Sequence, residues 1–201
     1  MKKVILYIHG KGGNAGEADH YRPLCADCDV VGLDYRAENP WEAEKEFPAL
    51  FDEACREYSS VRVIANSIGA FFAMHALAEK PIQRAWFISP VVDMEKLISD
   101  MMQWAGVTEA ELRQRKEIPT DFGETLSWDC LCYVRRHPLI WNIPTQILYG
   151  EKDNLTAQET ISAFADKTHA ALTVMPGGEH WFHTPAQMAF LDEWFGRTQR
   201  A

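Results

Sequence analysis

The sequence predicts an α/β protein with an open, mostly parallel sheet of about six strands, helices on both faces of the sheet and a helical insertion. Two observations carry this prediction. Short apolar runs alternate with stretches of helical periodicity along the 201 residues, which is typical of strand–helix–strand units. Several of the apolar runs also end in glycine or in polar side chains, where a buried strand would emerge into a loop.

The apolar runs mark the expected strands. They lie at residues 3–8, 30–35, 61–66, 84–90, 145–150 and 171–175. Between the second and third runs, Phe47, Phe51 and Cys55 recur at helical spacing and predict one face of a helix that packs on the sheet. Pro48 predicts a break in this helix, because proline lacks the N–H that a helix interior needs.

The segment from about residue 93 to residue 141 is too long for a simple connection between strands. An apolar stripe from Ile98 to Ala105, a capping pair formed by Thr108 and Glu111, and the apolar residues after Trp128 predict three helices here. We therefore expect a single domain over residues 1–201 with a helical cap inserted at about 93–141. Four aromatic side chains are candidates for the substrate pocket: Trp104, Phe122, Trp128 and Trp181.

The segment Ala65-Asn66-Ser67-Ile68-Gly69 lies between a buried strand and a stretch of small residues with helical character. A serine on a tight turn from a strand into a helix, with small residues around it, is typical of a nucleophile elbow. The usual G-x-S-x-G pattern is A-N-S-I-G here, so the first small position carries a methyl group. The alternative is that Ser67 only caps the helix.

An acid and a histidine follow at later strand ends. Asp153 closes the run that begins at Thr145, and His180 follows the run at 171–175 and a pair of glycines. Because catalytic groups in open α/β sheets gather at the carboxyl ends of the strands, we expect Ser67, Asp153 and His180 to meet there. Asp93, at another strand end, is the alternative acid, and His183 is the alternative base.

His183 stands directly before Thr184, which with Gln187 forms the pattern of a helix-capping box. This position favours a role for His183 at a helix start, and so favours His180 as the base.

The first apolar run breaks into His9-Gly10-Lys11-Gly12-Gly13-Asn14. Glycines let the backbone approach a ligand closely, so this loop can supply N–H donors to a developing negative charge. Its spacing fits neither a Walker loop nor a dinucleotide-binding loop, which speaks against a nucleotide site.

These motifs, H-G-K-G-G, A-N-S-I-G, G-E-K-D and G-G-E-H-W-F, occur in an order that resembles the α/β-hydrolase superfamily over nearly the whole chain. The resemblance implies that Ser67 attacks an acyl carbonyl, that His180 carries the proton, and that Asp153 orients His180. It also implies that the backbone N–H groups of Ile68 and Lys11 bind the oxyanion, with Gly12 as the alternative to Lys11.

We therefore expect a serine hydrolase that cleaves a small or medium acyl ester through an acyl-enzyme on Ser67, without a cofactor. A thioesterase, amidase, lactonase or carbon–carbon bond hydrolase would use the same three residues. The alternative from another class is a noncatalytic ligand-binding protein of the same fold.

Twenty basic residues against 29 acidic ones give a net charge of −9, which speaks against nucleic acid or an anionic membrane as a partner. The short apolar stretch after Met1 does not resemble a signal peptide, and no apolar run is long enough to span a bilayer, so we expect a cytoplasmic monomer or homodimer. The cysteines are odd in number, and Cys130-Leu131-Cys132 is too tight for a zinc knuckle with Cys25 and Cys28. No metal is expected.

Overall fold

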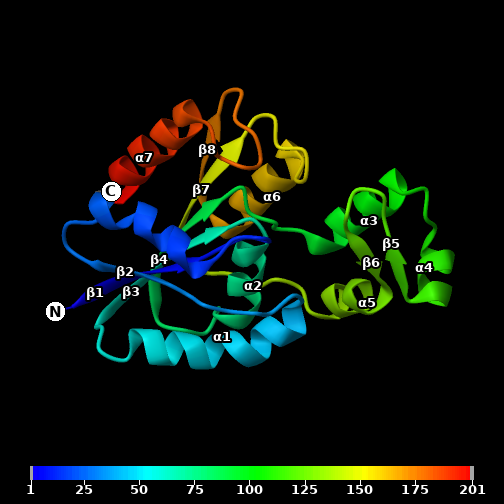
Figure 1. Ribbon diagram of the computed structural model, residues 1–201, viewed down its shortest axis with the longest axis horizontal. Coiled ribbons are helices and arrows are strands. Elements are labelled where there is room, and N and C mark those ends of the chain that lie inside the picture. The colour runs from blue at the N-terminus through cyan, green and yellow to red at the C-terminus, as the bar shows by residue number, and fades with distance from the viewer. Residues whose placement is uncertain (1, 200–201) are drawn as a thin grey trace. The chain divides into compact units, whose positions relative to one another are not determined.

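The computed structural model describes residues 2–199 and contains a six-stranded parallel sheet with the strand order β2-β1-β3-β4-β7-β8 (Figure 1). This confirms the predicted fold class. The strands are β1 (Lys3–Ile8), β2 (Asp29–Gly32), β3 (Ser60–Asn66), β4 (Ile82–Ile88), β7 (Thr145–Gly150) and β8 (Ala171–Met175). β2 and β4 begin and end earlier than predicted. Leu33 and Tyr35 lie beyond β2 but are buried, so the apolar run continues past the end of the strand.

One face of the sheet is covered by α7 (Pro185–Gln199) and by the two short 3-10 helices η1 (Ala15–His20) and η2 (Arg22–Leu24) (Figure 1). Side chains alternate across a strand, so Ile5 and Tyr7 of β1 share this face. They pack in one buried cluster with Trp194 and Phe195 of α7.

The opposite face packs against α1 (Pro40–Cys55) and α2 (Ile68–Ala76). Phe47 of α1 meets Phe72 of α2 edge to face. The prediction that Pro48 breaks the helix is wrong, because α1 is continuous through it. The apolar burial on both sides of Pro48, at Phe47 and Phe51, outweighs the lost N–H bond. α6 (Gln158–Thr168) packs beside β8.

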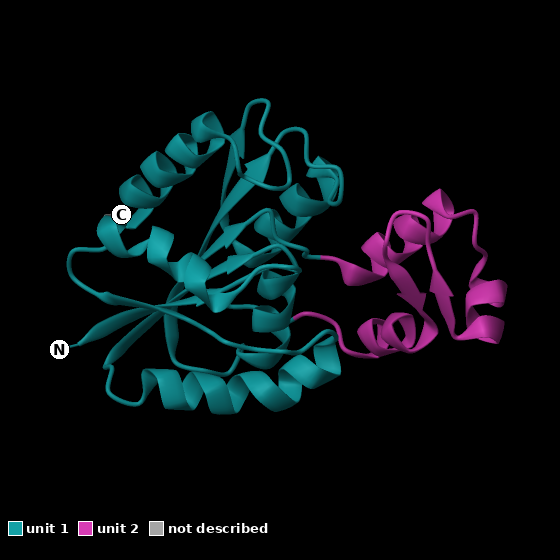
Figure 2. Ribbon diagram, viewed as in Figure 1, with its two compact units in different colours: residues 1–92, 140–201 teal, residues 93–139 magenta. Residues whose placement is uncertain are grey.

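The chain divides into two compact units, residues 1–92 with 140–201 and residues 93–139 (Figure 2). The second unit contains α3 (Met94–Trp104), α4 (Glu109–Arg115), β5 (Glu117–Pro119), β6 (Thr125–Ser127) and α5 (Trp128–Arg136). The three helices are where the sequence predicts them. The antiparallel hairpin β5–β6 was not predicted, because three-residue strands are too short to show an alternating pattern.

Within this second unit the guanidinium of Arg135 on α5 contacts both Glu95 of α3 and Glu109 of α4, at 2.7 Å in each case. One arginine thus links the three helices of the unit. Across residues 2–199, no helix is both long and apolar enough to cross a membrane.

Candidate active site

Ser67 stands on a strained turn between β3 and α2. Its φ is 48° and its ψ is −122°, a conformation that is unfavourable for a residue with a side chain. Two backbone bonds hold the turn: the Ser67 N–H donates to the carbonyl of Ile88 at 3.0 Å, and the N–H of Val91 donates to the carbonyl of Ser67 at 3.1 Å. The Ser67 side chain makes no capping hydrogen bond to α2, so the alternative that Ser67 only caps this helix is wrong.

Gly69 allows this turn to lie against the loop that follows β1. A Cβ at Gly69 would come 2.1 Å from the carbonyl oxygen of His9, which no side chain tolerates. Glycine at this position is therefore required by the close approach of two backbones.

The structure brings Ser67, His180 and Asp153 into one hydrogen-bonded chain. Ser67 Oγ lies 2.8 Å from His180 Nε2, and His180 Nδ1 lies 2.7 Å from Asp153 Oδ2. Since an ionised carboxylate only accepts hydrogen bonds, the Nδ1–H donates to Asp153 and Nε2 is left to accept from the serine hydroxyl. The Asp153 side chain is fully buried, and that of His180 is 15% exposed.

The second carboxylate oxygen of Asp153 is occupied too. Oδ1 accepts from the backbone N–H groups of Leu155 at 2.8 Å and Thr156 at 3.0 Å. Both oxygens of the buried carboxylate are thus hydrogen-bonded, which fixes its orientation toward His180.

The two alternative residues have other partners. The carboxylate of Asp93 caps α3 by accepting from the N–H of Lys96 at 2.9 Å. His183 donates from Nδ1 to the carbonyl of Trp181 at 2.7 Å, and its ring stacks on the Trp181 ring at 4.4 Å. The predicted capping box is present, because Gln187 N–H donates to Thr184 Oγ1 and Gln187 Oε1 accepts from the N–H of Thr184.

The loop after β1 passes beside Ser67. A Cβ at Gly10 would lie 3.3 Å from the Cβ of Ser67. Tyr35 anchors the start of the loop, because its hydroxyl donates to the carbonyl of His9 at 2.7 Å and its ring stacks on the His9 ring at 4.1 Å. Gly12 adopts a φ of 75°, which glycine accepts at no steric cost.

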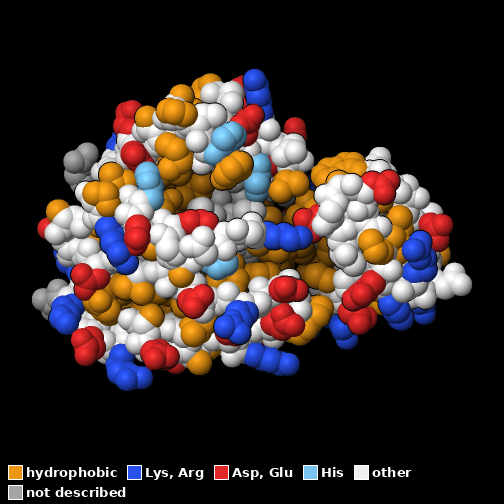
Figure 3. Space-filling model, viewed as in Figure 1, with side chains coloured by type: hydrophobic (Ala, Val, Ile, Leu, Met, Phe, Trp, Pro, Cys, Tyr) orange, Lys and Arg blue, Asp and Glu red, His pale blue; other side chains and the backbone are white. Residues whose placement is uncertain are grey.

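The candidate pocket aromatics lie in different units. Trp181 belongs to the first unit, directly after His180, and is 72% exposed. In the second unit, Trp104 and Phe122 are about half exposed and form an edge-on pair at 6.1 Å, and the ring of Trp128 lies 6.0 Å from the guanidinium of Arg113. On the face shown in Figure 3, histidine side chains gather on the first unit beside exposed hydrophobic ones.

Sequence reasoning missed a chain of three hydrogen-bonded side chains that begins at the elbow. Asn66 Nδ2 donates to the hydroxyl of Tyr7 at 2.8 Å, and that hydroxyl donates to Glu17 Oε2 at 2.6 Å. Burial raises the pKa of Tyr7 well above its ordinary value, so the hydroxyl stays protonated. The only signal in the sequence is the place of Asn66 directly before Ser67, since Tyr7 lies in an apolar run that predicts core.

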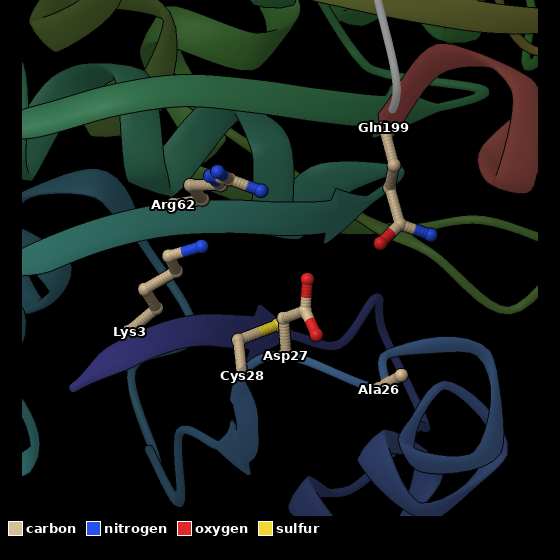
Figure 4. A pocket seen from close by; sticks show the side chains of 6 residues that line it. All are labelled: Lys3, Ala26, Asp27, Cys28, Arg62 and Gln199. Carbon is tan, nitrogen blue, oxygen red and sulfur yellow. The ribbon is translucent and has the colours of Figure 1, made fainter. Parts of the chain in front are cut away.

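A cavity of about 260 Å³ lies at the other end of the strands (Figure 4). Its walls come from the starts of β1 and β3, the turn before β2 and the end of α7: Lys3, Ala26, Asp27, Cys28, Arg62 and Gln199. It is separate from the serine, which follows the last residue of β3. Within residues 2–199 no three histidine, cysteine or acidic side chains are grouped as a metal site would need.

No family model and no characterised protein sequence matches this chain. Several solved structures do resemble it in fold. Est1E from Butyrivibrio proteoclasticus aligns with a TM-score of 0.74 at 16% identity, over 98% of this chain and 87% of its own. Alpha/beta hydrolase domain-containing protein 10 from mouse aligns with a TM-score of 0.76 at 15% identity, over 98% and 89%.

A thioesterase domain from the curacin biosynthetic pathway aligns with a TM-score of 0.58 at 19% identity, over 96% of this chain and 90% of that domain. The strand order of the sheet, the strained serine between β3 and α2 and these alignments agree. The chain has the α/β-hydrolase fold.

Proposed function

We propose that the protein is a serine hydrolase that cleaves a small or medium acyl ester through an acyl-enzyme on Ser67. The observation that carries the proposal is the hydrogen-bonded chain from Ser67 Oγ through the His180 ring to Asp153. The strained backbone at Ser67 costs stability, and the fully buried Asp153 carboxylate is oriented toward His180. A protein that only bound a ligand would have no use for either, so this geometry favours catalysis over the noncatalytic alternative.

In the acylation step, Ser67 Oγ forms a bond to the ester carbonyl carbon while its proton moves to His180 Nε2. The buried Asp153 carboxylate stabilises the imidazolium that results, and it holds the ring so that Nε2 faces the serine. As the tetrahedral intermediate collapses, the carbon–oxygen bond to the alcohol breaks, and the alcohol leaves with the proton from Nε2.

We assign the oxyanion donors to the backbone N–H groups of Ile68 and Lys11. Ile68 is the first residue of α2, where N–H groups have no partner within the helix. Lys11 follows Gly10, the residue of the loop that approaches Ser67. Each donor of this kind is worth on the order of 3 kcal/mol in the transition state.

Deacylation reverses the proton movements. His180, neutral again once the alcohol has left, takes a proton from a water molecule as the water oxygen bonds to the acyl carbon. The bond from the acyl carbon to Ser67 Oγ then breaks, Oγ regains its proton from Nε2, and the carboxylic acid is released.

Two observations support an ester with an aromatic or apolar group as the substrate. Est1E, which shares the fold, has been solved with ferulic acid bound, and Trp181 presents an exposed ring one residue after His180. The likeness to a thioesterase domain makes a thioester the second candidate, because the same three side chains would cleave it.

Labelling with a fluorophosphonate tests the proposal without knowledge of the substrate. We expect one adduct on the intact wild-type protein and none on Ser67→Ala, with labelling of His180→Ala slowed by at least about a thousandfold. p-Nitrophenyl esters of increasing acyl length, beside matched thioesters, then identify the bond. A folded wild-type protein that neither labels nor turns over either class would refute the proposal.

A further inference from the structure

A chain of three side chains connects the nucleophile elbow to the loop after β1. At the elbow, Asn66 Nδ2 donates to the Tyr7 hydroxyl at 2.8 Å. That hydroxyl donates to Glu17 Oε2 at 2.6 Å, and Glu17 Oε1 accepts from the N–H of Asn14 at 3.1 Å. One end of the chain therefore lies next to Ser67, and the other lies in the loop that carries Lys11.

The direction of these bonds is fixed by the carboxylate. An ionised carboxylate has no hydrogen to give, so Tyr7 must donate to Glu17 and can only accept from Asn66. Asn66 therefore presents its NH₂ group to Tyr7, and its Oδ1 is left over. Among the described residues this buried oxygen has no hydrogen-bond partner.

An unpaired buried acceptor is unfavourable, and this one lies on the residue directly before Ser67.

Three residues of the loop are glycines, which leave the backbone more freedom than other residues do: Gly10, Gly12 and Gly13. Within the loop, the N–H of Gly13 donates to the carbonyl of Gly10 at 3.1 Å. Tyr35 holds only its start, at the carbonyl of His9. Glu17 lies against its far part, where a Cβ at Gly13 would come 2.6 Å from Glu17 Oε1. Oxyanion stabilisation requires N–H donors from the loop and from the elbow to converge on a single oxygen atom, so their relative position decides how much they stabilise it.

We propose that Tyr7 and Glu17 are positioning residues, which fix the loop after β1 relative to the elbow so that the N–H groups of Lys11 and Ile68 converge on the oxyanion. The inference rests on the proposed function. It predicts a defect in the transition state, with substrate binding in the ground state left nearly unchanged.

Two variants test it. Tyr7→Phe removes the hydroxyl that joins Asn66 to Glu17. Glu17→Ala removes both carboxylate oxygens, so the Tyr7 hydroxyl and the N–H of Asn14 lose the partner that they share. Tyr58→Phe is the matched control, because Tyr58 donates to Asp29 Oδ2 at 2.8 Å in the same kind of bond, at the start of β2.

For both variants we expect kcat on a p-nitrophenyl ester to fall about ten- to a hundredfold, with KM changed by less than about threefold. Affinity for a trifluoromethyl ketone, which forms a tetrahedral adduct on Ser67, should fall by the same factor as kcat/KM. The double variant should be no worse than Tyr7→Phe alone, because both changes break one chain. Tyr58→Phe should match the wild type.

If the wild type is active and both variants keep full kcat and full ketone affinity, losing only thermal stability, the chain is structural and the inference is wrong. Additive losses in the double variant would also overturn it. If Tyr7→Phe fails to fold, Glu17→Ala decides alone, since Glu17 lies at the surface. A wild type without labelling or turnover would refute the proposed function, and this inference with it.

Discussion

Ser67 Oγ and His180 Nε2 lie 2.8 Å apart although 113 positions separate the two residues in the chain. The contact depends on the parallel sheet, because Ser67 follows β3 and His180 follows β8, and both strands end at the same edge. A hydroxyl and an imidazole at this distance form the proton path that the proposed reaction needs.

The acid beside the histidine is open to a direct test. Asp153→Asn should lower kcat by about ten-thousandfold. The amide oxygen stays with the N–H groups of Leu155 and Thr156, so the NH₂ group faces His180 Nδ1 and favours the tautomer with the proton on Nε2. Asp93→Asn should leave kcat and the melting temperature nearly unchanged, since asparagine caps a helix as well as aspartate does. Steady-state kinetics on one ester compares the two variants, and a larger loss in Asp93→Asn would contradict the assignment.

Gly69→Ala should abolish activity and lower the free energy of unfolding by several kcal/mol, because its Cβ would collide with the carbonyl of His9. The control is Gly196→Ala within α7, where an added Cβ meets nothing within 4 Å. There we expect stabilisation by about 0.5–1 kcal/mol, the usual gain for replacing glycine in a helix. Urea unfolding followed by circular dichroism measures both, and equal stabilities would rule out the proposed collision.

The end of α7 is anchored to β4 by a buried hydrogen bond. Trp86 Nε1 donates to Thr198 Oγ1 at 2.9 Å. Thr198→Val leaves this N–H unpaired and should cost about 1–3 kcal/mol in the free energy of unfolding. Thr198→Ser keeps the hydroxyl and should lose only the contribution of one methyl group, about 1 kcal/mol. The prediction fails if the two variants unfold at the same denaturant concentration.

Thiol chemistry should follow burial. Burial raises the pKa of Cys25 to about 12 and the pKa values of Cys55 and Cys130 to about 11. At pH 8 their thiolate fractions are therefore at least about a hundredfold below that of an ordinary thiol. Alkylation by iodoacetamide, read by peptide mass spectrometry, should be slow at these three positions and should speed up about tenfold per pH unit. A rate independent of pH would contradict the shifts.

The same shifts bear on stability. A raised pKa means that the folded state favours the protonated thiol. The resulting contribution to the free energy of unfolding is fully present below the pKa of a thiol in the unfolded chain, about 8.5. It is lost as the pH rises through about 11, and the melting temperature should decline over that range.

The sequence was most informative where burial is complete. Strands such as β1 and β7 are covered on both faces, so they stand out as continuous apolar runs and were placed within a residue. The helix start at Thr184 was also predictable, because a capping box is a local pattern that reads directly from residue spacing.

Features that depend on distant partners could not be predicted. Tyr7 reads as a core residue until the fold places it against Asn66, 59 positions away, and Glu17. Pro48 was misleading for the same reason, since the packing that keeps α1 intact comes from α2. The meeting of Ser67, Asp153 and His180 was predictable only because parallel strands share one carboxyl edge.

The close approach of Gly69 to the His9 carbonyl also indicates which position of the A-N-S-I-G segment must be glycine. The last position of this segment must be glycine, because the backbone of His9 lies against Gly69. The first position tolerates a methyl group, since it is the buried Ala65. A search pattern that demands glycine at both places would pass over this protein. One that pairs glycine two residues after the serine with a histidine–glycine step after the first strand would find it.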